Sequence, residues 1–248
     1  MIKYFSIERK YPIKCKAFLP SSGNIRTVIL GVHGFAGDKE SSMLSELAKH
    51  VDQKDGALIC FDFPAHGDSD RQENDLTVEN CINDLLAVAE WIEDTFPTAE
   101  KFIFATSFGG YISLLSLSRL QNYKVILRAP AVTMPKVLLG SVLKISAEQF
   151  EKLGTVECGF ERKIALPYSF YKGLLQYDPS RLVFDNKTFV FHGDKDDIVP
   201  IEDVLEFCDG RENINLEIIK NADHRFKNPG EIERIVSETV QFMETAYD

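Results

Sequence analysis

The sequence predicts an α/β fold in which a mostly parallel sheet carries helices on both faces. Short runs rich in β-branched and aromatic residues alternate along the chain with longer stretches of helical periodicity. The short runs are almost continuously apolar, as expected of strands covered on both sides rather than on one. Such alternation is typical of a parallel sheet with crossover helices.

Eight strands are expected. The six apolar runs that should form the centre of the sheet are 27–32, 57–61, 101–105, 124–129, 188–191 and 215–219. Two earlier segments, 2–7 and 13–19, are typical of an antiparallel pair, and we place this pair at the edge of the sheet.

Helical periodicity fills most of the connections between these strands. Helices are expected at 41–53, 77–96, 108–121, 201–208 and 231–246. The second has the clearest signal, because Leu85, Val88, Ala89 and Ile92 recur at helical spacing and Pro97 follows its end.

The chain has 248 residues, which is long enough to bury the core of one full domain. Residues 1–130 and 186–248 are expected to form that core. The stretch 131–185 departs from the alternation and is too long for a simple connection, so a small inserted cap or lid is predicted there. Pieces of helical or hairpin-like character lie at 137–143, 160–164 and 170–176.

Composition excludes several classes of function. The chain has 28 Lys and Arg against 38 Asp and Glu, a formal net charge of -10, which should repel nucleic acid. No apolar run reaches the ~18 residues of a membrane span, and the charged N-terminal segment is unlike a secretory signal. The five cysteines are widely spaced and lack metal-like grouping, so we expect reduced thiols and a cytoplasmic location.

The strongest chemical signal lies at residues 105–110, Ala-Thr-Ser-Phe-Gly-Gly, where a predicted strand joins a predicted helix. Small residues flank Ser107, as a very tight turn requires, because a large side chain at 105 or 109 would collide with neighbouring backbone. Ser107 could instead be an ordinary N-cap of the following helix. The segment alone does not decide between a nucleophile and a cap.

Two later loops carry an acid and a base. Residues 192–200, His-Gly-Asp-Lys-Asp-Asp-Ile-Val-Pro, follow an apolar strand and offer the carboxylates Asp194, Asp196 and Asp197. Residues 221–226, Asn-Ala-Asp-His-Arg-Phe, place His224 between the last strand and the last helix.

These segments together resemble the α/β-hydrolase family. Residues 105–110 are similar to its nucleophile elbow, G-x-S-x-G, with Ala105 in the first place. The loop 192–200 is similar to the family's H-G-x-x-D-x-x-V-P loop, whose acid is the fifth residue, here Asp196. The order serine, aspartate, histidine is also the family's order. The resemblance therefore implies Ser107 as nucleophile, His224 as base and Asp196 as the acid that orients the base.

Two further loops extend the resemblance. The segment His33-Gly34-Phe35 is similar to the H-G-[aromatic or apolar] segment that supplies an oxyanion-hole donor, so the implied donors are the N–H groups of Phe35 and Phe108. Their phenyl rings could also wall the acyl pocket. The loop 62–69 is similar to D-x-P-G-x-G-x-S, and we interpret it, including His66, as scaffolding rather than as a source of a second base.

The resemblance implies a serine hydrolase that cleaves carboxylic esters of small molecules through an acyl-enzyme, without a metal or an organic cofactor. The similarity is greatest to small bacterial cinnamoyl or feruloyl esterases and to monoglyceride lipase-like esterases, which implies aromatic or short- to medium-chain acyl groups. Bulky residues of the cap would suit such a pocket. They are Leu138, Leu139, Leu143, Phe150, Phe160, Tyr168, Phe170, Tyr171 and Tyr177.

Several alternatives stay open. The same three residues serve thioesterases, peptidases and amidases, because the fold does not fix the reaction. A catalytically silent scaffold that binds a ligand or a protein is a further possibility. A dinucleotide-binding oxidoreductase is disfavoured, since no G-x-G-x-x-G turn follows the early strands. The oligomeric state is left open.

Overall fold

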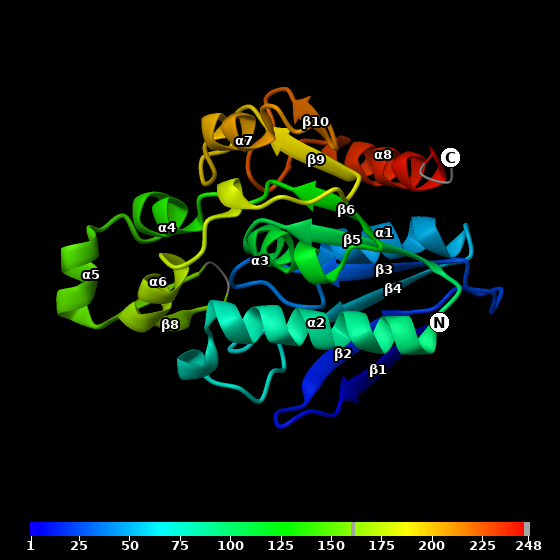
Figure 1. The fold of residues 1–248 in the computed structure, drawn as a ribbon, viewed down its shortest axis with the longest axis horizontal. Coiled ribbons are helices and arrows are strands. Elements are labelled where there is room, and N and C mark those ends of the chain that lie inside the picture. Colours follow the sequence, from blue (N-terminus) through cyan, green and yellow to red (C-terminus); the bar gives the residue numbers. More distant parts are fainter. Residues whose placement is uncertain (160–161, 246–248) are drawn as a thin grey trace.

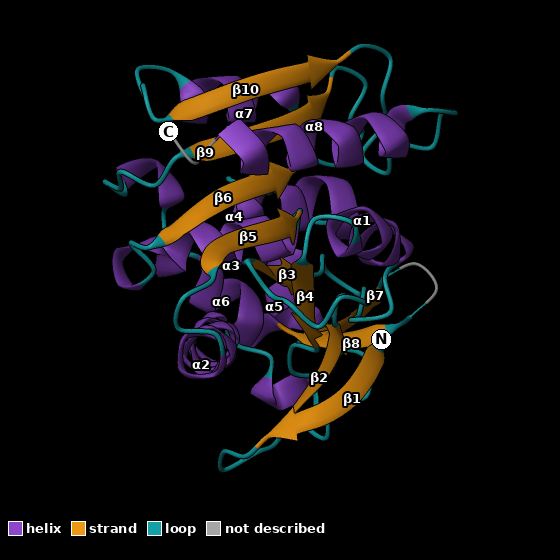
Figure 2. Cartoon of the chain, turned by 90° about the vertical axis from the view of Figure 1, so that its right-hand side faces the viewer, coloured by secondary structure: helices purple, strands orange, loops and turns teal. Residues whose placement is uncertain are grey.

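An eight-stranded sheet forms the centre of the protein in the computed structural model, which describes residues 1–159 and 162–245 (Figure 1). Its strands are β1 (Ile2–Ile7), β2 (Ile13–Phe18), β3 (Thr27–Val32), β4 (Gly56–Phe61), β5 (Glu100–Thr106), β6 (Tyr123–Arg128), β9 (Thr188–Gly193) and β10 (Ile214–Ile219). The spatial order is β1-β2-β4-β3-β5-β6-β9-β10. Among the described strands of this sheet, β2 pairs antiparallel with β1 and with β4, and every other neighbouring pair is parallel. The strands fan out from β1 to β10 in the twisted sheet of Figure 2.

Helices cover both faces of the sheet, and each face has its own apolar core. Helices α1 (Ser42–Asp52) and α8 (Glu231–Thr245) pack together on one face. Helices α2 (Val78–Thr95), α3 (Phe108–Ser116) and α7 (Ile201–Cys208) contribute to the core of the other face. Every residue of β3, β4 and β9 is buried, which explains their continuously apolar sequences. The predicted fold class is therefore confirmed.

The third predicted helix is shorter than its sequence pattern. We expected it to reach residue 121, but α3 ends at Ser116 and continues only as a 3₁₀ turn, η2 (Leu117–Arg119). The hydroxyls of Ser113 and Ser116 donate to the carbonyl oxygens of the residues four positions earlier. Such bonds compete with the helix's own backbone pairing and weaken it near its end.

The segment 131–185 has regular structure of its own. It contains α4 (Met134–Val137), a π-helical turn η3 (Leu138–Leu143), α5 (Ala147–Leu153), the antiparallel strands β7 (Thr155–Cys158) and β8 (Ile164–Pro167), α6 (Tyr168–Leu174) and a 3₁₀ turn η4 (Pro179–Arg181). Figure 1 shows α4, α5, α6 and β8 grouped beside the end of the sheet. Phe160, the start of the predicted piece 160–164 and the last residue of the predicted helix 231–246 lie outside the described residues.

Polar contacts tie both halves of this segment to the rest of the chain. The buried carboxylate of Asp203, on α7, accepts hydrogen bonds from Thr133 Oγ1 at 2.5 Å and Lys136 Nζ at 2.6 Å, next to and within α4. Farther along, Arg162 Nη1 donates to the carbonyl oxygen of Gly67 at 2.8 Å. These contacts attach the segment to the core near its start and near its middle.

The cysteines are not paired in disulfides. All five cysteines are free thiols, and four of them are buried. Within the described part of the chain, no helix is both long enough and apolar enough to cross a lipid bilayer.

Candidate active site

Ser107 occupies a strained turn between β5 and α3. Its backbone has φ 51° and ψ −116°, a conformation that residues other than glycine seldom adopt. The turn brings the start of α3 against the end of β3, so that a Cβ atom at Gly109 would lie 2.4 Å from the carbonyl oxygen of His33. Residue 109 must therefore be glycine for this turn to form, as the sequence predicted for small flanking residues.

Three side chains from distant loops meet at this turn. His224 Nε2 lies 3.1 Å from Ser107 Oγ, and His224 Nδ1 lies 2.7 Å from Asp196 Oδ2. An ionised carboxylate can only accept hydrogen bonds, so Nδ1 carries the imidazole proton and Nε2 accepts from the serine hydroxyl. A chain of this kind lets an imidazole take the serine's proton while the carboxylate stabilises the resulting imidazolium.

The environment of Asp196 keeps it ionised. Its side chain is fully buried, and burial alone would raise the pKa of the carboxyl. Hydrogen bonds from His224 and from the backbone N–H groups of Ile198 and Val199 outweigh this effect and hold the pKa of Asp196 below its usual value. At neutral pH the carboxylate is therefore charged where it meets the imidazole.

The other two carboxylates of this loop do not reach His224. Asp194 Oδ1 accepts a hydrogen bond from the backbone N–H of Asn221 at 2.5 Å. Asp197 is exposed to solvent. The structure thus brings Asp196, and not its two neighbours, to the imidazole.

The loops that carry Asp196 and His224 are in direct backbone contact. Lys195 N donates to the carbonyl oxygen of Ala222 at 3.0 Å. A Cβ atom at Gly193 would lie 2.2 Å from that same oxygen. Glycine at residue 193 therefore permits the close approach that sets one loop against the other.

The segment of Phe35 also lies against the serine turn. A Cβ atom at Gly34 would be 3.4 Å from Ser107 Cβ, so the backbone of residues 33–35 passes directly beside the nucleophile candidate. Phe108 is the first residue of α3, where backbone N–H groups have no acceptor within the helix. The two N–H groups predicted as oxyanion donors thus belong to segments that both adjoin Ser107.

Two buried histidines hold this segment in place. His66 Nε2 accepts a hydrogen bond from Ala36 N–H at 2.9 Å, and His33 Nε2 accepts one from Phe63 N–H at 3.2 Å. Burial lowers the pKa of His33 to about 4 and that of His66 to about 3, so both rings are neutral and able to accept. His66 is buried with both ring nitrogens engaged, in keeping with the scaffolding role expected for it.

A buried ion pair fixes the same two loops from the other side. Lys39 Nζ lies 2.7 Å from Asp62 Oδ2 and 2.7 Å from Asp68 Oδ2. Burial would lower the pKa of Lys39, but the bonds to these carboxylates outweigh it and raise the pKa. The loop after β3 is therefore held to the loop after β4 by charged contacts as well as by the histidines.

The expectation that the rings of Phe35 and Phe108 wall an acyl pocket is wrong for Phe108. Its ring has no exposed surface and packs against Phe63 and Tyr111. Phe170 of α6, which is 1% exposed, closes the cluster with ring centroids 5.9 Å from Phe108 and 6.2 Å from Phe35. Of the two residues whose N–H groups are the predicted donors, Phe35 is the one that is partly exposed.

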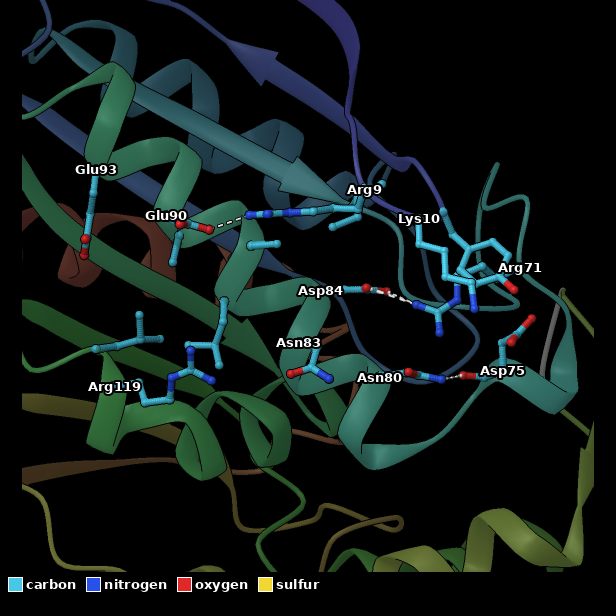
Figure 3. Close-up of a pocket in the computed structure, with 16 residues that line it drawn as sticks. Arg9, Lys10, Arg71, Asp75, Asn80, Asn83, Asp84, Glu90, Glu93 and Arg119 are labelled. Carbon is cyan, nitrogen blue, oxygen red and sulfur yellow. Dashed lines mark hydrogen bonds and ion pairs between the residues drawn. The ribbon is translucent and has the colours of Figure 1, made fainter.

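A groove of about 810 Å³ lies elsewhere on the surface, between the β1–β2 turn and α2 (Figure 3). Arg71 pairs there with Asp84 at 3.1 Å, and Arg9 pairs with Glu90. None of the five residues predicted for the chemistry lines this groove. Arg9 joins the β1–β2 turn at the edge of the sheet to α2, and Arg71 joins the segment between β4 and α2 to the same helix, away from the serine site.

Comparison with known proteins places the chain in a family. Residues 23–156, more than half of the sequence, match the family model described as serine aminopeptidase, S33. The chain belongs to this family. No curated protein matches the hydrolase by sequence.

Solved structures share the fold of this hydrolase over almost its whole length. Est1E from Butyrivibrio proteoclasticus, solved with ferulic acid bound, is 20% identical with a TM-score of 0.86 and covers 97% of this chain and 98% of its own. Mouse alpha/beta hydrolase domain-containing protein 10 is 18% identical with a TM-score of 0.80, covering 98% of this chain and 99% of its own. A putative hydrolase from Agrobacterium vitis is 19% identical, with a TM-score of 0.82 and coverages of 97% and 98%. The resemblance to α/β-hydrolases is thereby confirmed.

One charged residue beside the site was missed in the sequence. Arg128 ends the apolar strand β6, and its carbonyl oxygen accepts the hydrogen bond from Ser107 N–H at 2.9 Å. A charge at the carboxyl end of a mostly apolar strand was the available signal, because a buried charge is costly without partners.

Proposed function

We propose that the chain is a serine esterase that hydrolyses carboxylic esters through an acyl-enzyme. The observation that carries the proposal is the unbroken series of contacts from Ser107 Oγ through the His224 ring to Asp196 Oδ2. Ser107 Oγ attacks the ester carbonyl carbon while its proton passes to His224 Nε2, and the alcohol leaves with that proton. Water then attacks the acyl-enzyme in the same way and releases the acid.

Two backbone N–H groups complete the proposed machinery. Those of Phe35 and Phe108 would donate to the oxygen that becomes negative in the tetrahedral intermediate. The approach of Gly34 to Ser107 supports this assignment for the first donor, and the position at the start of α3 supports it for the second. The neutral ring of His66 would act indirectly, by fixing Ala36 next to the first donor.

We also propose that residues 131–185 act as a cap that restricts the acyl group. Its residue Phe170 contacts the rings of both donor residues, so the cap reaches the loops that would bind the ester carbonyl. Est1E, a structural relative, has been solved with ferulic acid, which favours an aromatic or cinnamoyl-type acyl group among the candidates. Phe170 is almost fully buried, so it fills the space beside the donor loops that a long alkyl chain would need.

A peptidase is the second candidate, because the family model is described as a serine aminopeptidase. Thioesters and amides would use the same attack and the same oxyanion donors. A silent binding scaffold is disfavoured, because the serine, imidazole and carboxylate are present within hydrogen-bonding distance. The bond that is cleaved must therefore be established by a substrate panel.

The experiment follows product release from p-nitrophenyl acetate, butyrate and octanoate, from methyl ferulate and from an aminoacyl p-nitroanilide. Ser107→Ala should lose turnover by a factor on the order of 10⁶, as other serine hydrolases do when the nucleophile is removed. Ser113→Ala is the matched control, since Ser113 is a buried serine on the same helix whose hydroxyl donates to the carbonyl oxygen of Gly109, within its own helix. It should keep its turnover.

Labelling with a fluorophosphonate separates the possible failures. Hydrolysis of the anilide but of none of the esters would replace the esterase proposal by the peptidase. Labelling at Ser107 without turnover of any compound would retain the serine nucleophile and reject the proposed substrates. A wild-type protein that neither turns over nor labels would contradict the proposal as a whole.

A further inference from the structure

Arg128 is a buried cation that touches both sides of the candidate site. Its backbone carbonyl oxygen accepts the hydrogen bond from Ser107 N–H, in the turn that carries the nucleophile. Its guanidinium Nη2 donates to the carbonyl oxygen of Arg225 at 2.7 Å, one residue after His224. A single residue thus joins the turn of the serine to the loop of the histidine.

The guanidinium also packs on the loop of His224. It lies over the ring of Phe226 at 4.8 Å from the ring centroid, a distance at which a cation and an aromatic face attract each other. Burial lowers the pKa of Arg128 to about 10, while the carboxylates of Asp196 and Asp223 oppose this shift. The charge is therefore retained at neutral pH, and two nearby carboxylates compensate for it.

The loop that receives these contacts needs outside restraint. Asn221 and Phe226, on either side of His224, have φ values of 63° and 56°, in the left-handed region that costs energy for residues other than glycine. Asp194 holds the first of them through its backbone N–H. Arg128 contacts the other end of the loop, where the strained Phe226 lies.

We propose that Arg128 is a positioning residue that holds His224 Nε2 at hydrogen-bonding distance from Ser107 Oγ. The expected effect of Arg128 on turnover rests on the proposed esterase function. Its expected effect on the mobility of the His224 loop does not. Only a donor can replace the bond to the carbonyl oxygen of Arg225, so an apolar side chain of similar length would fill the space and still release the loop. The ring nitrogen would then sample positions outside the reach of the serine hydroxyl.

The test compares Arg128→Met and Arg128→Lys with Arg211→Met. Arg211 is the matched control because its guanidinium lies over the rings of Phe207 and Phe184 and donates to the carbonyl oxygens of Ser180 and Leu182, among residues predicted to have no part in the chemistry. In Arg128→Met, kcat for the best ester should fall by about 10- to 100-fold with KM nearly unchanged, since small misplacements of reacting groups have effects of that size. Arg128→Lys keeps the charge and should recover most of that loss. Arg211→Met should keep its kcat.

Hydrogen exchange gives a second reading that needs no substrate. Backbone amides of residues 221–226 should exchange faster in Arg128→Met than in wild type, and should be unaffected in Arg211→Met. Wild-type kcat together with wild-type exchange in this loop would overturn the proposal, and so would an equal loss in both methionine variants. If Arg128→Met does not fold, the lysine variant decides, because its shorter side chain should leave a small but measurable increase in exchange of these amides together with a small loss of kcat.

The two proposals fail separately. A wild-type protein without turnover or labelling contradicts the esterase function, and the exchange of residues 221–226 then decides the role of Arg128 alone. An active wild type with unchanged loop exchange in the Arg128 variants contradicts only the positioning role.

Discussion

Acidification should destabilise this fold through its buried histidines. The folded pKa values are about 4 for His33 and about 3 for His66, both lowered chiefly by burial, against about 6.5 in an unfolded chain. Their stability contribution is complete above pH 6.5 and is lost as the pH falls towards the folded values, because only the unfolded chain then binds these protons. His192 acts in the same direction, since burial lowers its pKa too.

One carboxyl opposes the histidines. Burial raises the pKa of Asp84 to about 6, although Arg71 acts against the shift. Between pH 6 and 4 the folded state therefore binds one proton that an unfolded aspartate does not, which stabilises the fold as the pH falls. His33 and His66 together let the unfolded chain bind two protons that the folded state does not, so the unfolded chain still binds one proton more in total. The free energy of unfolding should thus fall by about 1.4 kcal/mol for each pH unit, or about 3 kcal/mol from pH 6 to pH 4, and His192 can only add to this loss.

Urea unfolding at pH 7, 6, 5 and 4 measures this slope. His66→Gln removes one proton site while its amide can still bond Ala36 N–H, so the slope should decrease by about 1.4 kcal/mol per pH unit. Asp84→Asn removes the opposing carboxyl, so the slope should increase by about the same amount even though the variant is less stable at pH 7. Equal slopes in the wild type and both variants would refute the reasoning.

Three other substitutions test the site and its support. Asp196→Asn should lower kcat by about 10⁴-fold in ester assays, because an amide favours the wrong imidazole tautomer, and a loss below tenfold would argue against its role. Phe170→Ala should raise the ratio of octanoate to acetate hydrolysis by opening space beside the donor loops. Phe150→Ala should not, since Phe150 is equally buried but its ring pairs with Tyr168 and Tyr171 of the same segment. Lys39→Met should lower the free energy of unfolding by about 3–5 kcal/mol, since the buried carboxylate of Asp62 loses its cation. Lys49→Met, at an exposed ion pair, should lower it by less than about 1 kcal/mol. Equal losses in urea titrations would contradict this reasoning.

The strands of the sheet could be predicted because burial imposes one sequence pattern on most of them, whereas their order in space could not be read from that pattern. Strands covered on both faces are almost entirely apolar, as β3 and β4 are. The run 215–219, expected at the centre of the sheet, is instead the edge strand β10 and is only partly buried. The three separate motifs could be related to one another through their resemblance to the α/β-hydrolase family. Parallel strands bring their carboxyl ends, and the loops that follow, to one edge of the sheet. The structure brings Ser107, Asp196 and His224 together there.

The interior of the segment 131–185 was harder to predict. Its helix α5 has seven residues and buries only Phe150, so hydrophobic periodicity is too weak to reveal it. The available signal was local, because Ser146 and Gln149 form a reciprocal capping box at its start. The π-helical turn η3 has no comparable signal in its side chains.

The contacts of Arg128 and the burial of Phe108 could not be predicted for a different reason. Both depend on which side chains meet across the sheet and the cap, and that follows from three-dimensional packing rather than from local sequence. Phe108 is an aromatic residue next to the nucleophile candidate, as expected of a pocket-lining residue, but its ring packs into the core. A motif specifies the backbone of a site more tightly than it specifies the direction of the neighbouring rings.

The backbone contact between Gly193 and Ala222 has a consequence for how the length of this chain can vary. Because the two loops touch at main-chain atoms, inserting or deleting a residue in either would displace the carboxylate relative to the imidazole, and no side-chain adjustment could restore the match. The segment between β6 and β9 bonds through its main chain near its two ends, where Ala131 N–H donates to the carbonyl oxygen of Ser107 and the carbonyl oxygen of Lys187 accepts from Val125 N–H. Between these points side chains such as Asp203 and Arg162 attach it, so that part can change in length without moving the pair. Laboratory evolution for new substrates should therefore accept insertions within 131–185 and reject them within 193–196 and 221–224.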